Sequence, residues 1–185
     1  FVIPFISATI ASVALGWSYG RSPLAMWHRI FLGDATGAIV AAPFALLLLG
    51  VATSWPHMSR TKWLEALILI LTFAGMAVLS LGGFIPFAFL MIPLLIWAAL
   101  RFRVVGAVIA VLALTIFTAS FTLAGASPFA VTATNSKYAN EGLQLFLLVA
   151  STTAFMMAAL AEENRASLRQ LQAANKSLGS QAAES

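Results

Sequence analysis

Residues 140–178 read NEGLQLFLLVASTTAFMMAALAEENRASLRQLQAANKSL, and this stretch decides the fold. Its first part, 140–161, is apolar and matches the roughly 20 residues that an α-helix needs to cross a bilayer. From Leu160 to Leu178 the pattern continues with polar residues and regularly spaced leucines. A spanning helix that continues into water is typical of proteins that pass a signal across a membrane, and less typical of a self-contained enzyme.

The composition places the whole chain in a membrane. Of its 185 residues, 61% are hydrophobic and only 9% are charged, whereas soluble domains carry roughly a quarter charged residues. The net charge of +4 comes from basic residues spread thinly between apolar blocks, so we expect them to set topology and not to bind nucleic acid. Cysteine is absent, which excludes disulfides, thiolate metal sites and cysteine nucleophiles.

Apolar runs near bilayer length predict an all-α, polytopic transmembrane helix bundle with a C-terminal cytoplasmic, coiled-coil-like helix. We expect a transmembrane sensor block over 1–161 and a cytoplasmic signalling helix with the start of a linker over 162–185. Because Phe1 opens inside an apolar run, the block is expected to be N-terminally truncated. Gly82-Gly83 predicts a tight hairpin between the third and fourth spans. The six predicted spans are 1–16, 30–51, 63–82, 84–101, 104–124 and 140–161.

Basic residues predict the orientation, because loops rich in Lys and Arg stay in the cytoplasm. With the C-terminus inside, seven basic residues face the cytoplasm: Arg60, Lys62, Arg101, Arg103, Arg165, Arg169 and Lys176. Three face the opposite side: Arg21, Arg29 and Lys137. The predicted topology is therefore multi-pass, with both ends of the chain inside.

Four polar residues share one depth in the outer third of this predicted topology, namely Arg29, Asp34, Glu141 and Gln144. Ionisable groups inside a membrane usually face protein or water and have a partner. The four could pair with one another or line a water-filled ligand pocket, and the sequence does not choose between these alternatives. An Asp34 that simply reaches the outer surface is a third possibility.

Small residues and prolines mark candidate packing and hinge positions. Gly33, Gly37 and Ala41 recur every four residues, the spacing that lets two membrane helices approach closely. A mid-span proline usually bends a helix, although Arg101 at the end of the same span could simply extend to the lipid headgroups. The packing or hinge candidates are Gly33, Gly37, Pro43, Pro93, Trp97 and Arg101, and Pro128 and Phe129 mark an outer loop.

The exit helix carries a short heptad pattern. With Leu168 at position a, Leu171 falls at d, Asn175 at the next a and Leu178 at the next d. An Asn at one a position fixes register in parallel two-stranded coils. These four residues therefore predict a dimeric connector, and the rival is an amphipathic helix lying on the membrane surface.

The order of motifs resembles the first MASE type of membrane-associated sensor domain over spans two to six and the exit helix. The motifs are Trp27…Gly33-Asp34…Gly37…Pro43, Pro93…Trp97…Arg101-Phe102…Gly106, Ser127-Pro128-Phe129 and Leu143-Gln144-Leu145-Phe146. The chain departs from the family at Arg103, where a small residue is usual after Arg-Phe, and at Ala126-Ser127 before Pro128-Phe129, where Gly-Pro-Phe is expected.

The resemblance implies a bacterial inner-membrane sensory module of about eight helices joined in cis to a cytoplasmic output domain. Such domains are diguanylate cyclases, phosphodiesterases, PAS domains or histidine kinases, which implies cyclic di-GMP or two-component signalling. The family's ligands are largely undefined, so the stimulus, a small molecule or a protein, stays open.

Two other classes of function compete with sensing. A transporter or permease would show internal symmetry between its halves, and none is evident. An enzyme would need a catalytic constellation, and His28 and His57 fall on opposite sides of the predicted topology. We therefore predict no catalytic residue, metal or cofactor in this fragment, although the full-length protein could be a signalling enzyme. The expected partners are membrane lipid and a second copy of the chain.

Overall fold

The computed structural model describes residues 2–20, 22–50, 59–81, 88–124 and 136–184. Within these ranges five helices are long and apolar enough to cross a membrane. These helices are α1 (Val2–Tyr19), α2 (Pro23–Leu48), α3 (Arg60–Leu81), α4 (Met91–Leu123) and α6 (Ser136–Glu184). A short 3₁₀ turn, η1 (Ala88–Leu90), precedes α4. The predicted all-α transmembrane bundle is therefore confirmed.

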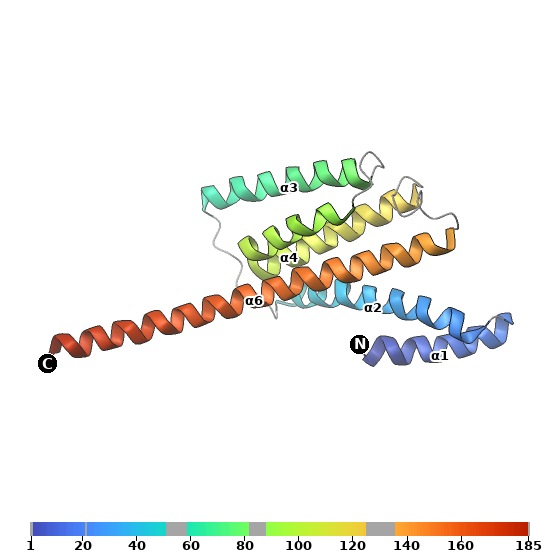
Figure 1. Cartoon of the computed structure of the whole chain (residues 1–185), viewed down its shortest axis with the longest axis horizontal. Coiled ribbons are helices and arrows are strands. Elements are labelled where there is room, and N and C mark those ends of the chain that lie inside the picture. The colour runs from blue at the N-terminus through green and yellow to red at the C-terminus, as the bar shows by residue number, and fades with distance from the viewer. Residues whose placement is uncertain (1, 21, 51–58, 82–87, 125–135, 185) are drawn as a thin grey trace.

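The predicted spans 84–101 and 104–124 form the two arms of one helix, α4. Inside α4 only Arg103 leaves the helical region, with φ 61° and ψ −154°. The chain reverses there, and the two arms run in opposite directions (Figure 1). Five helices in the described residues are long and apolar enough to cross a membrane. Because α4 reverses at Arg103, its two arms correspond to two of the six predicted spans.

The bundle has two ends, and the turn between α1 and α2 marks one of them. We call one the α1–α2 end, where Gly20 adopts φ 62° and stops α1 as a left-handed glycine cap. Pro23 then opens α2, since proline at the first helical position sacrifices no hydrogen bond. We call the other the exit end, where α4 reverses and α6 leaves the bundle (Figure 1).

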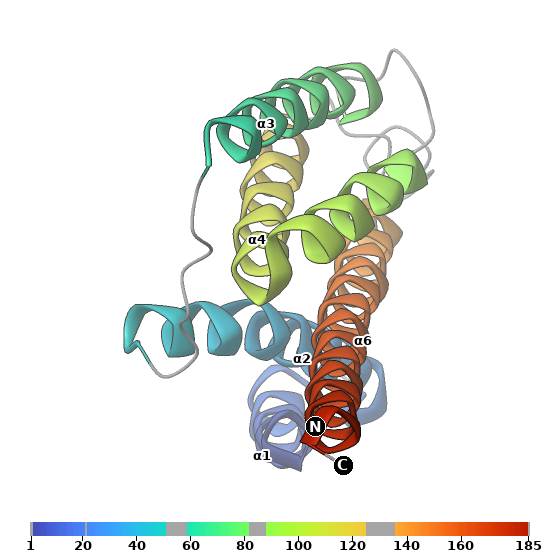
Figure 2. The same cartoon turned by 90° about the vertical axis from the view of Figure 1, so that its left-hand side faces the viewer.

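The core lies between α4 and α6. One face of α6 is buried through Leu143, Leu147, Ala150, Ala154 and Ala158, which recur every three or four residues as helical periodicity requires. These residues belong to one buried cluster with side chains of α2, α3 and α4, and within it α6 packs mainly on α4. Viewed along the bundle, α4 and α6 lie between α1 at one margin and α3 at the other (Figure 2).

The outside of the bundle is apolar, as a lipid-facing surface should be. Large side chains such as Ile3, Ile70 and Ile116 are more than half exposed, which would be costly in water but is favourable against acyl chains. Helix α1 packs mainly on α2. The multi-pass membrane location follows from these surfaces together with the lengths of the helices.

Helix α6 continues far beyond the bundle (Figure 1). It has 49 residues, so at 1.5 Å per residue it is about 73 Å long, more than twice the hydrocarbon thickness of a bilayer. The predicted span and the predicted exit helix are therefore one uninterrupted helix.

Two predictions from the sequence lie outside the described residues. They are the tight hairpin at Gly82-Gly83 and the outer-loop pair Pro128 and Phe129. His57 and most of the loop 54–62 also fall outside them.

Candidate functional site

The α1–α2 end holds a polar contact between α2 and α6. Arg29 Nε donates a hydrogen bond of 2.8 Å to Glu141 Oε1, and His28 Nε2 lies 3.3 Å from the same oxygen. A charge buried in a membrane is stable only when it is paired. The ion pair therefore holds the start of α6 against α2, and His28 is a member of the site that the sequence analysis did not include.

One helical turn further along, Gln144 also lies between α2 and α6. Its side-chain Nε2 would be 3.3 Å from a Cβ atom built on Gly33, so the glycine makes room for the amide. Thr36 Oγ1 donates to the Leu32 carbonyl at 2.7 Å and lies 3.3 Å from the Gln144 carbonyl oxygen. Three of the four predicted pocket residues, Arg29, Glu141 and Gln144, thus meet at one helix–helix contact.

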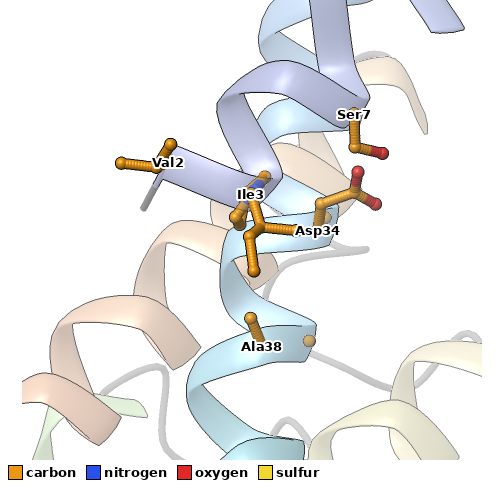
Figure 3. Close-up of a pocket in the computed structure, with 8 residues that line it drawn as sticks. Val2, Ile3, Ser7, Asp34 and Ala38 are labelled. Carbon is orange, nitrogen blue, oxygen red and sulfur yellow. The ribbon is translucent and has the colours of Figure 1, made fainter. Parts of the chain in front are cut away.

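Asp34 lies apart from this contact. The Asp34 carboxylate faces α1 and not α6, and it lies on the same side as the Ser7 hydroxyl (Figure 3). Of the four residues that share one depth in the predicted topology, three thus meet at the α2–α6 contact and Asp34 lies elsewhere. Residues at equal depth face different neighbours when their angles around the helix axis differ.

Aromatic rings hold α1 on α2 beside these polar groups. Trp27 stacks on Phe31 with ring centroids 5.1 Å apart, and Phe5 of α1 meets Trp27 edge-on at 5.4 Å. Trp27 Nε1 donates a hydrogen bond of 3.1 Å to Thr9 Oγ1. Trp27 therefore joins two helices as well as fitting the interfacial position expected of tryptophan.

The exit end holds a second set of contacts, which centre on the α4 reversal. Arg101 donates two hydrogen bonds to the Glu65 carboxylate of α3. Its Nε donates to Oε2, and its Nη2 donates to Oε1 at 2.6 Å. Such a bidentate pair is among the stronger polar contacts in proteins. Arg101, predicted either to act in packing or to extend to headgroups, in fact ties α3 to α4.

The same reversal contacts the exit helix. Arg103 Nε lies 3.6 Å from Glu162 Oε2, and Arg165 Nη2 donates a hydrogen bond of 2.6 Å to the Leu100 carbonyl oxygen. We call these two contacts the exit latch. It holds α6 at the point where the helix leaves the bundle.

The backbone at Arg103 makes this latch unusual. A positive φ with ψ near −154° belongs to a region that is populated almost only by glycine, and it costs of order 1–3 kcal/mol for other residues. The surrounding contacts must offset that cost.

The predicted hinge candidates occupy less strained positions. Pro93 lies in the first turn of α4, where proline breaks no helical hydrogen bond. The reversal of α4 lies at Arg103 and not at Pro93, and Pro93 remains a predicted hinge. Pro43 lies inside α2 and lines a small groove with Phe155, and Trp97 is 38% exposed. A Cβ atom built on Gly37 would have no neighbour within 4 Å.

The predicted connector residues project beyond the bundle. Leu168, Leu171 and Leu178 are 52%, 66% and 64% exposed, and Asn175 is exposed as well. A run of exposed leucines on a polar helix is uncommon unless another surface covers it.

Sequence reasoning missed the acidic partners at the exit end, Glu65 and Glu162. Glu65 is the acid within the third predicted span, and an acid in an apolar span is expected to have a cationic partner. That signal could have drawn attention to Glu65, but its partner Arg101 lies 36 residues away, so only the tertiary structure pairs them.

A double-mutant cycle on the Glu65–Arg101 pair should measure its strength. We expect Glu65→Gln or Arg101→Gln alone to lower the dodecyl sulfate fraction at which the protein unfolds, because each leaves a charge without its partner at the membrane edge. The double variant should lose less than the sum. Unfolding in mixed micelles with rising dodecyl sulfate gives the measurement, with the exposed Arg169→Gln as control. Additive losses would show that the pair contributes nothing.

The chain is thus a multi-span helical membrane domain with ion pairs at both ends and one helix that continues out of the bundle. The MASE1 family model matches residues 1–165, so the chain belongs to the MASE1 family of membrane sensory domains. No curated protein and no solved structure matches the chain.

Proposed function

We propose that this chain is the sensory part of a bacterial inner-membrane signalling protein and relays a stimulus along α6 to a cytoplasmic output domain in cis. The output would be a diguanylate cyclase, a phosphodiesterase or a histidine kinase. The exit end is then cytoplasmic, an orientation supported by its seven Lys and Arg residues.

The observation that carries this proposal is the continuity of α6. One helix of 49 residues contacts α2 at Glu141, contacts the α4 reversal at Glu162 and Arg165, and then leaves the bundle (Figure 1). Because an unbroken helix transmits tilt, rotation and translation along its axis, a change at either contact moves its free end.

A relay needs two states that differ at identifiable contacts. In the described state both the Arg29–Glu141 pair and the exit latch are formed. Arg29 Nη2 is buried without a hydrogen-bond partner among the described residues, so the α2–α6 contact is incomplete. A stimulus that moves α2 against α6 would change this contact and strain the latch at the other end.

The latch is suited to release. The Arg103–Glu162 pair is a single charge contact at 3.6 Å between side chains that are 30% and 40% exposed, and such pairs contribute roughly 0–1 kcal/mol. The Arg103 backbone, which is itself strained by of order 1–3 kcal/mol, lies at this contact. Because the ion pair is weak, a displacement of α6 can break it.

The output would depend on how two copies of α6 lie together. We propose that Leu168, Leu171, Asn175 and Leu178 form the seam of a parallel two-stranded coil with a second chain. The exposure of the three leucines in the single chain supports this, as does the polar Asn175 at an a position, which favours one register and two strands.

Charge exchange in the exit latch tests the relay. With residues 1–178 fused to a dimer-dependent reporter, we expect Arg103→Glu and Glu162→Arg each to change the output several-fold, because each places like charges 3.6 Å apart in the native geometry. The double variant restores opposite charges and should return the output toward that of the parent.

The matched control is Glu163→Arg, which makes the same charge change one residue along α6 at an exposed position. It should leave the output near that of the parent. Equal output from the parent, the two single variants and the double variant would remove the exit latch from the relay while leaving the membership of the family untouched.

A further inference from the structure

Between α1 and α2 lies a groove of about 690 Å³ that is separate from the α2–α6 contact. Helix α1 contributes Ile3 and Ser7 to its wall, and α2 contributes Gly37 and Ala38. Asp34 is the ionisable residue in the lining (Figure 3). The groove thus combines one carboxylate and one hydroxyl with otherwise apolar walls.

The carboxylate of Asp34 has no hydrogen bond or ion pair with any residue that the structure describes. The nearby cation of the same helix, Arg29, is turned toward Glu141 and bonded to it. An ionisable side chain inside a membrane normally has a counter-charge. We therefore expect the positive partner of Asp34 to come from outside the described residues.

The depth of Asp34 limits what that group can be. The apolar span of α2 starts at Met26, which places Asp34 about 12 Å further along the helix axis. A small hydrated cation would have to shed its water beside apolar walls, which is unfavourable. A cation carried on an apolar chain would instead gain from the same walls.

The floor of the groove has room for such a chain. A Cβ atom built on Gly37 would meet nothing within 4 Å, and Ala38 next to it is exposed. The ammonium would lie between the Asp34 carboxylate and the Ser7 hydroxyl, which point toward the same side (Figure 3). Its chain would lie along Gly37 and Ala38.

We propose that the α1–α2 groove binds a bilayer amphiphile bearing a primary ammonium group, with Asp34 as its counter-ion. The charge complementarity between one unpaired carboxylate and an otherwise apolar groove is the basis of the assignment. The binding site is independent of the relay along α6, so each can fail without the other.

The test uses photolabelling in phosphatidylcholine nanodiscs. A diazirine-bearing dodecylamine is compared with the diazirine-bearing dodecanol of equal length, and labelled positions are mapped by mass spectrometry. We expect the amine to label α1 and α2 residues of the groove at least about tenfold more than the alcohol, because only the amine pairs with the carboxylate. Unlabelled phosphatidylethanolamine should compete, whereas further phosphatidylcholine should not.

Variants assign the effect to Asp34. The preference for the amine should disappear in Asp34→Asn, persist in Asp34→Glu and persist in the control Glu163→Gln, which neutralises an exposed acid on α6. Gly37→Leu should fill the floor and reduce labelling by both probes. Equal labelling by amine and alcohol in the parent chain would overturn the proposal, and so would an unchanged preference in Asp34→Asn. If neither probe labels the groove, another helix or a second copy covers it, and the proposal is also wrong.

Discussion

Replacing Gly106 by alanine is expected to prevent the α4 reversal from forming. A Cβ atom at this position would lie 2.4 Å from Phe102 Cβ and 2.6 Å from the Ala98 carbonyl oxygen. Both neighbours belong to the arm that folds back at Arg103, and neither can move as the end of a flexible side chain can. Overpacking usually costs about 1–3 kcal/mol, and we expect Gly106→Ala to reach or exceed the top of that range.

The measurement is the yield of monodisperse protein in mild detergent, followed by its thermal unfolding. Gly75→Ala is the matched control, since a Cβ atom on Gly75 of α3 would meet nothing within 4 Å. That control should be neutral or more stable by up to about 1 kcal/mol, because alanine is the better helix former. A Gly106→Ala protein as abundant and as heat-stable as the parent would show that the two arms of α4 do not approach in this way.

The second large effect is expected at Leu171 in the exit helix. If Leu171 is a d residue of a parallel dimer, Leu171→Glu places two carboxylates in the seam and removes two buried leucines. At roughly 1.5–3 kcal/mol per leucine, the loss corresponds to at least a hundredfold weaker pairing. Ala173→Glu adds the same charge at an outward f position and should leave pairing intact.

Engineered cysteines measure this pairing directly, because the chain contains no cysteine of its own. Asn175→Cys at an a position should form an intermolecular disulfide on mild oxidation, and Leu171→Glu should abolish it. Ala173→Cys should not crosslink, since outward positions of two helices lie beyond the roughly 7 Å between Cα atoms that a disulfide spans. Equal crosslinking at 173 and 175 would indicate random collision in place of a defined seam.

The ion pairs between helices explain why the structure was only partly predictable. Each acid and each base is visible in the sequence, but Arg29 and Glu141 are 112 residues apart and Arg103 and Glu162 lie on different helices. Counting depth from span boundaries brought Arg29, Glu141 and Gln144 together correctly. It also placed Asp34 with them, because depth says nothing about which side of α2 a residue occupies.

Arg103 and Gly106 also show which features the sequence predicts and which need the tertiary structure. The motif Arg101-Phe102…Gly106 marked this region through its resemblance to the family, and an arginine in place of a small residue marked position 103 as a departure. The sequence did not predict the backbone reversal in this region. The positive φ at Arg103 and the close approach at Gly106 arise only because the two arms of α4 meet there.

The amino-acid sequence alone determined that this protein is a multi-span helical membrane domain with one helix that continues out of the bundle, because hydrophobic length and periodicity are local properties of the chain. Which helices touch, which charges pair, and that Asp34 faces α1 while Arg29 faces α6 were decided by the tertiary structure. Those features depend on the rotation of each helix about its axis, and that rotation is settled by packing between residues far apart in the chain.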